Sequence, residues 1–248
     1  MEDFYSFIDE LRAKYPDLII ENCGSGGMRS DNGTLRHFHL QSTSDQETFY
    51  NNPSIVAGSL ALMPPEKAGI WAYPYAATVH ENNKLYFESE KTEEILESIK
   101  NRNQDTHTTM FNMVTGQLGL MYLSGRLDLM DKQNQALVEE GIAIFKRNRE
   151  FVKNAYPIYP MGFTYIGKKG FYSMGLTDEN ANEIKLAIWK INAANDTCEL
   201  DLTKYVGKTA KIENVYSKNS KYSFENGVLK ATLDKATYQA VFFEISAK

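Results

Sequence analysis

The feature that most constrains this chain is a pair of short apolar runs that each end in small and polar residues. Residues 18–20 (LII) run into ENCGSGG at 21–27, and residues 37–40 (HFHL) run into QSTSD at 41–45. Glycines, a thiol, hydroxyls and a carboxylate at strand ends are typical of the carboxyl edge of the sheet in α/β enzymes. The pattern therefore predicts a parallel sheet whose functional groups gather at that edge.

Three helices are predicted from apolar periodicity and terminal signals. The first covers residues 2–14, and the second covers residues 51–62 with Pro53 in its first turn. The clearest covers residues 131–153, where Asp131 can cap the first turn. The first helix should present one apolar face made of Phe4, Phe7, Ile8 and Leu11.

Three strands are predicted in the same part of the chain, over residues 18–20, 37–40 and 68–72. Residues 76–103 are polar and are interpreted as a loop with a short helix, and residues 106–123 as an apolar segment at the edge of a barrel. Strand and helix thus alternate, as in a parallel sheet with right-handed crossovers. Three strands are too few to bury such a sheet with its helices. We therefore expect that the strands pair with another chain, or that the chain is the carboxy-terminal part of a larger barrel.

After Pro157 and Pro160 the pattern changes to short alternating runs separated by turn sequences such as Glu225-Asn226-Gly227. We divide the chain accordingly into an α/β domain at residues 1–157 and an all-β domain at residues 158–248. The runs predict strands over residues 170–175, 184–192, 198–202, 210–216, 222–233 and 238–245.

Composition argues against several classes of function. The net charge of −5 disfavours a nucleic acid or an anionic membrane as partner, because either would select a basic face. Four histidines with neither an HxxxH nor a CxxC spacing make a zinc site unexpected. The amino terminus lacks the features of a secretory signal, and no apolar run approaches the ~20 residues of a membrane helix. With Cys23 and Cys198 interpreted as free thiols, these features predict a soluble cytoplasmic protein.

The glycine-rich stretch at 22–31 has several interpretations. It matches neither a P-loop nor a GxGxxG pattern, so a phosphate-binding loop is not predicted. Cys23 could act as a nucleophile, although the sequence places no histidine to serve as its base. The alternative is a tight turn after a strand, in which the glycines only permit positive φ angles.

Asp45 also has two interpretations. It could be a carboxylic acid aimed into a cleft, where it would act as a general acid and base. It could equally be the N-cap of the segment that follows, because Ser44 and Asp45 are both good caps. Trp71, Tyr73 and Tyr75 are interpreted as barrel core more readily than as a platform for a sugar.

Several motifs occur in a fixed order along the chain: ENCGSGGMRSD, QSTSDQE, PPEKAGIWAYP, the segment from TTMFN to KRNREF, and FYSMGLTDENANEIKLAIWKIN. Together they resemble glycoside hydrolase family 36, the bacterial-type α-galactosidases. The resemblance covers nearly the whole chain. It implies the carboxy-terminal portion of a (β/α)8 barrel, about its last three strands, followed by an antiparallel β-sandwich.

The resemblance also implies hydrolysis of terminal α-galactosides with retention of configuration, by a nucleophile and a general acid/base. Asp45 matches the family's acid/base. Cys23 and Gly26 match residues that line the sugar pocket near the 2-hydroxyl, and Arg29 stands where an arginine holds the loop or the acid. Gln46 departs from the family, since some members carry an aromatic or acidic residue there.

The KWD-type motif that carries the family's nucleophile does not occur in this sequence. The isolated chain is therefore expected to be inactive and to need the missing amino-terminal half as its partner. The full-length enzyme is expected to be a homo-oligomer, and no metal or organic cofactor is implied. Two other classes of function remain open: a non-catalytic carbohydrate-binding module, and an assembly fragment whose exposed sheet edge pairs with another subunit.

Overall fold

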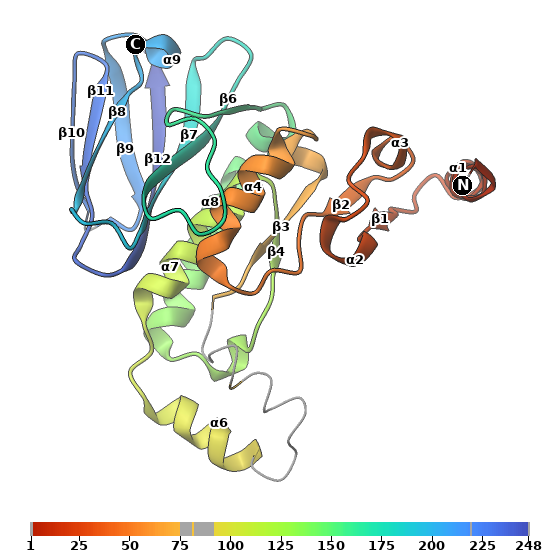
Figure 1. The fold of residues 1–248 in the computed structure, drawn as a ribbon, viewed down its shortest axis with the longest axis horizontal. Coiled ribbons are helices and arrows are strands. Elements are labelled where there is room, and N and C mark those ends of the chain that lie inside the picture. Colours follow the sequence, from red (N-terminus) through yellow and green to blue (C-terminus); the bar gives the residue numbers. More distant parts are fainter. Residues whose placement is uncertain (1, 75–80, 82–91, 219, 248) are drawn as a thin grey trace.

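The first half of the chain is organised on a four-stranded parallel sheet in the order β1-β2-β3-β4 (Figure 1). The protein is represented by a computed structural model that describes every residue except 1, 75–80, 82–91, 219 and 248. Gly69 lies opposite Ser42 in one parallel pair, and Trp71 lies opposite Tyr122 in the next. The strands are β1 (Glu21–Asn22), β2 (Leu40–Ser42), β3 (Ala68–Ala72) and β4 (Leu120–Leu123).

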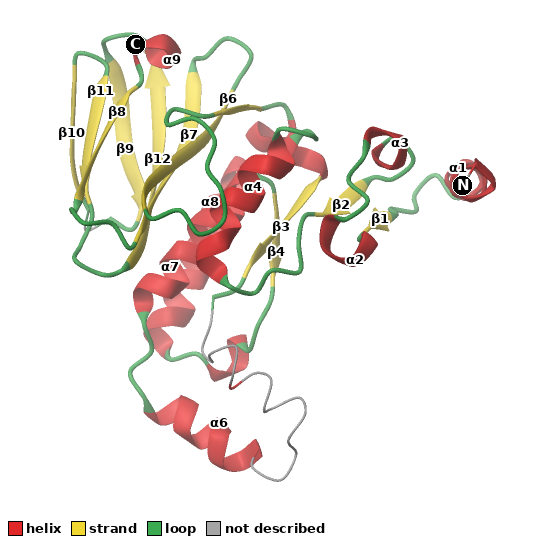
Figure 2. Cartoon of the chain, in the orientation of Figure 1, coloured by secondary structure: helices red, strands yellow, loops and turns green. Residues whose placement is uncertain are grey.

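Helices and short helical turns connect these strands, and α4 and α7 pack against β3 (Figure 2). Ile70 and Ala72 of β3 are buried beneath them. In chain order the elements are α1 (Glu2–Lys14), α2 (Gly24–Gly27), α3 (Asn32–Leu35), η1 (Phe49–Asn51), α4 (Asn52–Leu60), η2 (Pro65–Lys67), α6 (Thr92–Asn101), α7 (Thr106–Thr115), η4 (Gly116–Leu118), η5 (Leu127–Leu129) and α8 (Lys132–Lys153).

The second half of the chain forms two antiparallel sheets. One has five strands in the order β5-β6-β7-β12-β9, and the other has three in the order β10-β11-β8. The elements are β5 (Tyr156–Ile158), β6 (Gly170–Thr177), β7 (Glu183–Ile191), β8 (Thr197–Asp201), α9 (Thr203–Val206), β9 (Ala210–Tyr216), β10 (Lys221–Glu225), β11 (Val228–Thr232) and β12 (Tyr238–Ala247).

The five-stranded sheet is buried on both faces. Along β7, Leu186 and Ile188 belong to a core shared with Leu200 and Leu229 of the three-stranded sheet. The alternate residues of β7, including Trp189, face the other way into a second core that also contains side chains of α4, α7, α8 and β3. Because neighbouring side chains of a strand point to opposite faces, one central strand serves both cores.

Local signals explain several of these elements. Asp131 caps α8, because its carboxylate accepts a hydrogen bond from the Asn134 amide at 2.8 Å. The β10–β11 hairpin turns at Asn226 and Gly227, whose φ angles of 52° and 84° are those of the tight turn that Asn-Gly favours.

Much of the predicted secondary structure is confirmed. The helices expected at 2–14, 51–62 and 131–153 are α1, α4 and α8, and the strand expected at 68–72 is β3. The six antiparallel runs correspond to β6 to β12, with the run at 222–233 divided into β10 and β11. Of the segment 76–103, residues 76–80 and 82–91 lie outside the described part, and α6 provides the expected short helix.

Other predictions are wrong in their boundaries or their type. The first two strands begin later than expected, at Glu21 and Leu40. Residues 106–123 contain helix α7 and a fourth strand, β4, which the apolar pattern did not separate. Leu18 and Ile19 lie before β1, the edge strand of the sheet as described, and are 44% and 67% exposed.

The apolar face of α1 is also only partly buried. Ile8 is covered, whereas Phe4 and Phe7 are 50% and 55% exposed. Among the described helices, none is both long enough and apolar enough to cross a bilayer. Strand β5 (Tyr156–Ile158) crosses the predicted domain boundary between residues 157 and 158 and pairs with β6.

Candidate active site

The glycine-rich segment after β1 forms a turn with left-handed backbone. Gly24, Ser25, Gly26 and Gly27 have φ angles of 56°, 53°, 73° and 91°. The turn is closed by the Gly27 amide, which donates to the Cys23 carbonyl at 2.8 Å. A left-handed residue other than glycine costs roughly 1–2 kcal/mol, so three glycines among four positions make this turn accessible. The alternative interpretation, in which the glycines permit positive φ, describes this backbone correctly.

The same turn lies directly against the segment that follows β2. A Cβ atom added to Gly26 would lie 2.6 Å from the Asp45 amide nitrogen and 2.8 Å from the Asp45 carboxyl carbon. A Cβ on Gly27 would lie 2.6 Å from the Thr43 carbonyl oxygen. Contacts under 3.0 Å are closer than real Cβ atoms approach, so only glycine fits at both positions. The turn therefore brings two of the predicted site residues, Gly26 and Asp45, into contact.

Asp45 is an exposed residue in an irregular segment between β2 and η1. Hydrogen bonds hold the residues beside it. The Thr43 hydroxyl donates to the Gly69 carbonyl at 2.7 Å, and the Ser44 hydroxyl accepts from the Gln46 amide at 3.0 Å. The N-cap residue of η1 is Thr48 and that of α4 is Asn51. The interpretation of Asp45 as a helix cap is therefore wrong, and its carboxylate is available to a ligand.

Cys23 and Arg29 flank the glycine turn. Cys23 is an exposed free thiol at its start. Arg29 is exposed at its end, and its Cβ and Cγ lie 2.9 Å from where a Cβ on Gly24 would be. Hydrogen bonds from Thr34, followed by the charge of Arg29, hold the pKa of the Asp31 carboxyl below its usual value. Arg29 therefore packs against Gly24 of the turn, and its charge acts on Asp31.

Two residues that the sequence interpretation missed fasten the turn to the sheet. The Asn22 amide donates to the Gln41 side-chain oxygen at 2.5 Å and to the Arg29 carbonyl at 3.1 Å. Gln41, which is fully buried, donates in turn to the Ser42 carbonyl at 2.7 Å. Asn22 is the last residue of β1 and Gln41 the next-to-last residue of β2, each close to a small-residue cluster, and that position is the signal that could have identified them.

Three aromatic rings lie along the face of β3 and β4 beside this edge. Trp71 stacks on Tyr73 with centroids 5.8 Å apart and meets Tyr122 edge-on at 5.2 Å. The Trp71 indole donates to the Ser42 hydroxyl at 3.0 Å. Trp71 and Tyr122 are half-buried and Tyr73 is buried, so the rings pack against the sheet while two of them keep an exposed part. Tyr75, the third aromatic residue of the sequence motif, lies outside the described residues.

Burial and nearby carboxylates of the site affect the pKa values of two of these tyrosines. Burial, followed by the charges of Glu47 and Asp45, raises the pKa of Tyr73 to about 12. Burial, followed by Glu21, also raises the pKa of Tyr122 above its ordinary value. Both phenols therefore remain neutral hydrogen-bonding groups at neutral pH. The arrangement offers an exposed carboxylate, a thiol and an aromatic surface at one sheet edge, and such a carboxylate can carry out acid–base chemistry.

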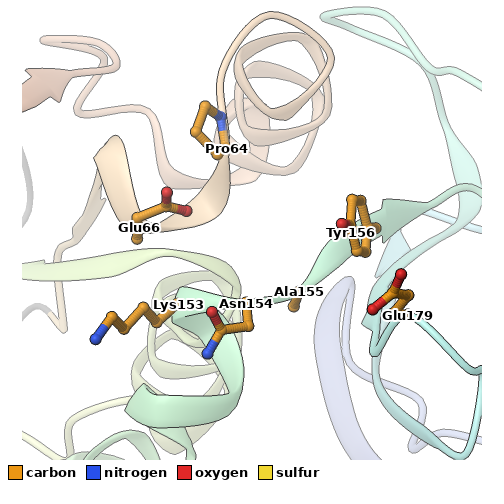
Figure 3. A pocket seen from close by; sticks show the side chains of 7 residues that line it. All are labelled: Pro64, Glu66, Lys153, Asn154, Ala155, Tyr156 and Glu179. Atoms are coloured by element: carbon orange, nitrogen blue, oxygen red, sulfur yellow. The ribbon is translucent and has the colours of Figure 1, made fainter.

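A cavity of about 470 Å³ lies elsewhere, where η2, the end of α8 and β5 meet (Figure 3). Glu66 and Lys153 lie on one side of it, and Tyr156 and Glu179 lie on the other. Because η2 directly precedes β3, this cavity lies at the amino-terminal edge of the sheet, away from the Asp45 segment. None of the four predicted site residues lines it. Among the described residues, no group of three or more His, Cys, Asp or Glu side chains could hold a metal ion.

Comparison with known proteins agrees with the sequence motifs. An α-galactosidase C of Aspergillus terreus, recorded as probable, is 36% identical over 69 residues, which are 28% of this chain and 9% of that protein. An Escherichia coli α-galactosidase is 35% identical over 66 residues, which are 27% of this chain and 9% of that protein. The matched segments are thus small parts of these relatives.

Solved structures match over nearly the whole chain. A GH36 α-galactosidase of Geobacillus stearothermophilus, in complex with raffinose, superposes with a TM-score of 0.72 at 14% identity. That match covers 99% of this chain and 31% of the other. An α-galactosidase of Lactobacillus brevis gives a TM-score of 0.67 at 13% identity, again over 99% and 31%. At these identities the likeness shows the fold, and the chain spans about a third of the length of either structure.

The family described as Melibiase matches residues 1–155, which include the glycine turn, the Asp45 segment and all four parallel strands. This match, together with the α-galactosidase relatives, confirms the resemblance seen in the motifs. The chain belongs to the melibiase family.

Proposed function

We propose that this chain forms part of the catalytic centre of a retaining α-galactosidase, with Asp45 as the general acid/base. The observation that carries this role is the contact of the Gly26 turn with Asp45, which places an exposed carboxylate beside a turn at the carboxyl edge of a parallel sheet. The parallel part would be the carboxy-terminal portion of a (β/α)8 barrel, and the two antiparallel sheets the β-sandwich that follows it.

Each step of the retaining reaction assigns a task to Asp45. As an acid it protonates the glycosidic oxygen while a second carboxylate attacks the anomeric carbon. As a base it then takes a proton from the water that hydrolyses the glycosyl-enzyme intermediate. Cys23 and Gly26 would line the galactose pocket near the 2-hydroxyl, and Arg29 would support the turn from its outer side.

We propose that the nucleophile comes from a segment outside these 248 residues, because the KWD-type motif is absent from them. A retaining mechanism needs two carboxyl groups about 5–5.5 Å apart across one sugar. The chain alone should therefore not hydrolyse an α-galactoside. It should do so when it is joined to, or mixed with, the amino-terminal barrel portion of a melibiase-family α-galactosidase.

The test is hydrolysis of p-nitrophenyl α-galactoside by the chain alone and by the assembled protein. Asp45→Asn should lower turnover of the assembled protein by about 10²–10⁴-fold, the usual contribution of general acid–base catalysis. Azide should restore part of the rate of Asp45→Asn and release an azide product of retained α configuration, because the nucleophile is still present. Asp17→Asn, a change of an exposed carboxylate in the turn after α1, should have no effect.

Two outcomes would contradict this assignment. Normal turnover by the chain alone would show that it already holds both carboxylates. An inverted azide product from Asp45→Asn would make Asp45 the nucleophile.

A carbohydrate-binding role without catalysis is the second candidate, favoured by the half-buried Trp71 beside Tyr73. It predicts galactoside binding that Asp45→Asn leaves unchanged and no turnover in any assembly.

A further inference from the structure

A cavity of about 190 Å³ opens where the first turn of α4 meets the loop before β6 and the ends of β7 and β12. Residues from both halves of the chain line it, so it exists only because the antiparallel part packs on α4 and α7. Six of the lining side chains are uncharged hydrogen-bonding groups: Tyr50, Asn51, Ser54, Tyr165, Asn192 and Tyr238. None of the four predicted site residues is among those that line this cavity.

The cavity lies at the same end of the parallel sheet as the Asp45 segment, which is the irregular stretch between β2 and η1. Helix α4 follows the segment that leaves the carboxyl end of β2 and leads back toward the start of β3. In a parallel sheet such a helix runs antiparallel to its strands, so its first turn lies at the carboxyl edge. The cavity and Asp45 therefore open at the same end of the sheet.

The wall of the cavity is fixed by aromatic packing. The rings of Tyr50 and Tyr238 stack with centroids 4.7 Å apart and an angle of 6° between their planes. Phe49 meets both rings edge-on, at 5.5 Å and 5.2 Å. Tyr165 contributes a third ring, which is 69% exposed and leaves much of its surface open to a ligand.

The hydrogen-bonding groups of the cavity are not used within the described structure. The side chains of Asn51, Ser54 and Asn192 form no hydrogen bond with another described residue, and the same holds for the three tyrosine hydroxyls. In the Asp45 segment, by contrast, Thr43, Ser44 and Gln46 all bond to their neighbours. Amides and hydroxyls that line a cavity and have no internal partner are free to bond a ligand.

The charges of the cavity indicate which ligand atoms it suits. Lys168 and Lys169 line it and form no ion pair among the described residues, and no lining residue is acidic. Ammonium groups only donate, and side-chain amides both donate and accept, so together they suit a ligand rich in oxygens, such as hydroxyl groups. Tyrosine rings favour a ligand with an apolar C–H face. A pyranose ring combines both properties.

We propose that this cavity is an accessory binding site for a neutral sugar unit of an α-galactoside. The choice of an α-galactoside as ligand rests on the proposed function, whereas the cavity itself does not depend on Asp45. Bound here, the remote part of a glycan would be held at the same end of the sheet as the catalytic carboxylate. The antiparallel half of the chain would thereby take part in substrate recognition.

The test is calorimetric titration of the full chain with raffinose, expected to bind with a dissociation constant on the order of 1 mM. Tyr165→Ala should weaken binding by roughly two- to tenfold. Asn192→Gly should weaken it further, and glycine suits the positive φ of 45° at that position. Tyr156→Ala is the matched control, because Tyr156 is 57% exposed and lines the other cavity.

The Asp45→Asn chain separates this site from the catalytic one. Raffinose binding that survives Asp45→Asn and falls with Tyr165→Ala would support the accessory site, even if the assembled protein showed no hydrolysis. Binding lost with Asp45→Asn and unchanged by Tyr165→Ala would overturn it. The absence of binding, or displacement of raffinose by sulfate, would also overturn it, and the latter would show an anion site at the lysines.

Discussion

Gly26 is the residue at which the two site motifs meet, and its lack of a side chain is what permits the meeting. Both its φ of 73° and the 2.6 Å distance from a would-be Cβ to the Asp45 amide require glycine. The side-chain amides of Asn22 and Gln41 also hold this turn against the sheet, through a hydrogen bond from the Asn22 nitrogen to the Gln41 oxygen at 2.5 Å. At the scale of residues, the candidate site therefore depends on the close approach of the Gly26 backbone to Asp45 as much as on side-chain contacts.

We predict that Gly26→Ala destabilises the chain by about 1–3 kcal/mol, because the left-handed backbone becomes strained and Asp45 must move. Urea denaturation measures the loss. Gly58→Ala is the matched control: Gly58 lies within α4 with nothing within 4 Å of an added Cβ. That change should stabilise the chain by about 0.5–1 kcal/mol, because alanine is the better helix former. Equal effects of the two substitutions would contradict the packing described for the turn.

At the scale of elements, a polar cluster on Glu244 joins α8 to the five-stranded sheet. Glu244 of β12 accepts hydrogen bonds from Arg147 at 2.5 Å and from Asn148 at 2.9 Å, both on α8. Lys185 of β7 lies 3.6 Å from its other oxygen. Burial by itself would raise the pKa of Glu244, but the bonds from Asn148 and Arg147 and the charge of Lys185 outweigh it and lower that pKa.

This lowered pKa predicts a loss of stability in acid. Above pH 4.5, the ordinary value for the group, Glu244 is ionised in both states and its full stabilisation is present. As the pH falls below that value, the unfolded chain binds the proton first, so the free energy of unfolding decreases. Chemical denaturation at a series of pH values should show this slope, and Glu244→Gln should reduce it. Glu213→Gln, which changes a half-exposed carboxylate on β9, should leave the slope nearly unchanged. Equal slopes for the wild-type and Glu244→Gln chains would contradict the role of this cluster.

At the scale of the whole molecule, one hydrophobic core crosses from the parallel to the antiparallel half. Ile70 of β3, Phe111 of α7, Trp189 of β7 and Phe242 of β12 belong to it. The Trp189 indole also donates to the Thr115 hydroxyl at 3.0 Å across the same junction. Because the two halves share this core, unfolding of one half exposes apolar side chains of the other. We therefore expect their stabilities to be coupled, although the sequence pattern suggests a domain boundary at residue 157.

We predict that the chain unfolds in a single transition. The sequence contains two tryptophans, so the Trp71→Phe chain reports fluorescence from Trp189 alone. Its fluorescence midpoint in urea should coincide with the loss of helical circular dichroism, which reports mainly on the parallel half. The Trp189→Phe chain provides the reverse control. A fluorescence transition that persists after the helices have unfolded would instead show an all-β domain that folds by itself.

The sequence by itself determined the elements that depend on near neighbours. Helix α8 with its Asp131 cap, strand β3, and the β10–β11 hairpin at Asn226-Gly227 all follow from periodicity and turn chemistry within a few residues. The family motifs, which are also read directly from the sequence, were enough to single out Gly26 and Asp45 as candidate site residues.

Only the tertiary structure decided what depends on residues far apart in the chain. Strands β1 and β2 begin later than their apolar runs because parallel pairing, not local apolarity, sets their ends. The same pairing places Asn22 beside Gln41, and this register brings the glycine turn onto Asp45. The cavity at Tyr50 and Tyr238 likewise needs two segments that meet only when the halves pack. Such contacts depend on pairing and packing between segments that are far apart in the sequence, so patterns among near neighbours do not predict them.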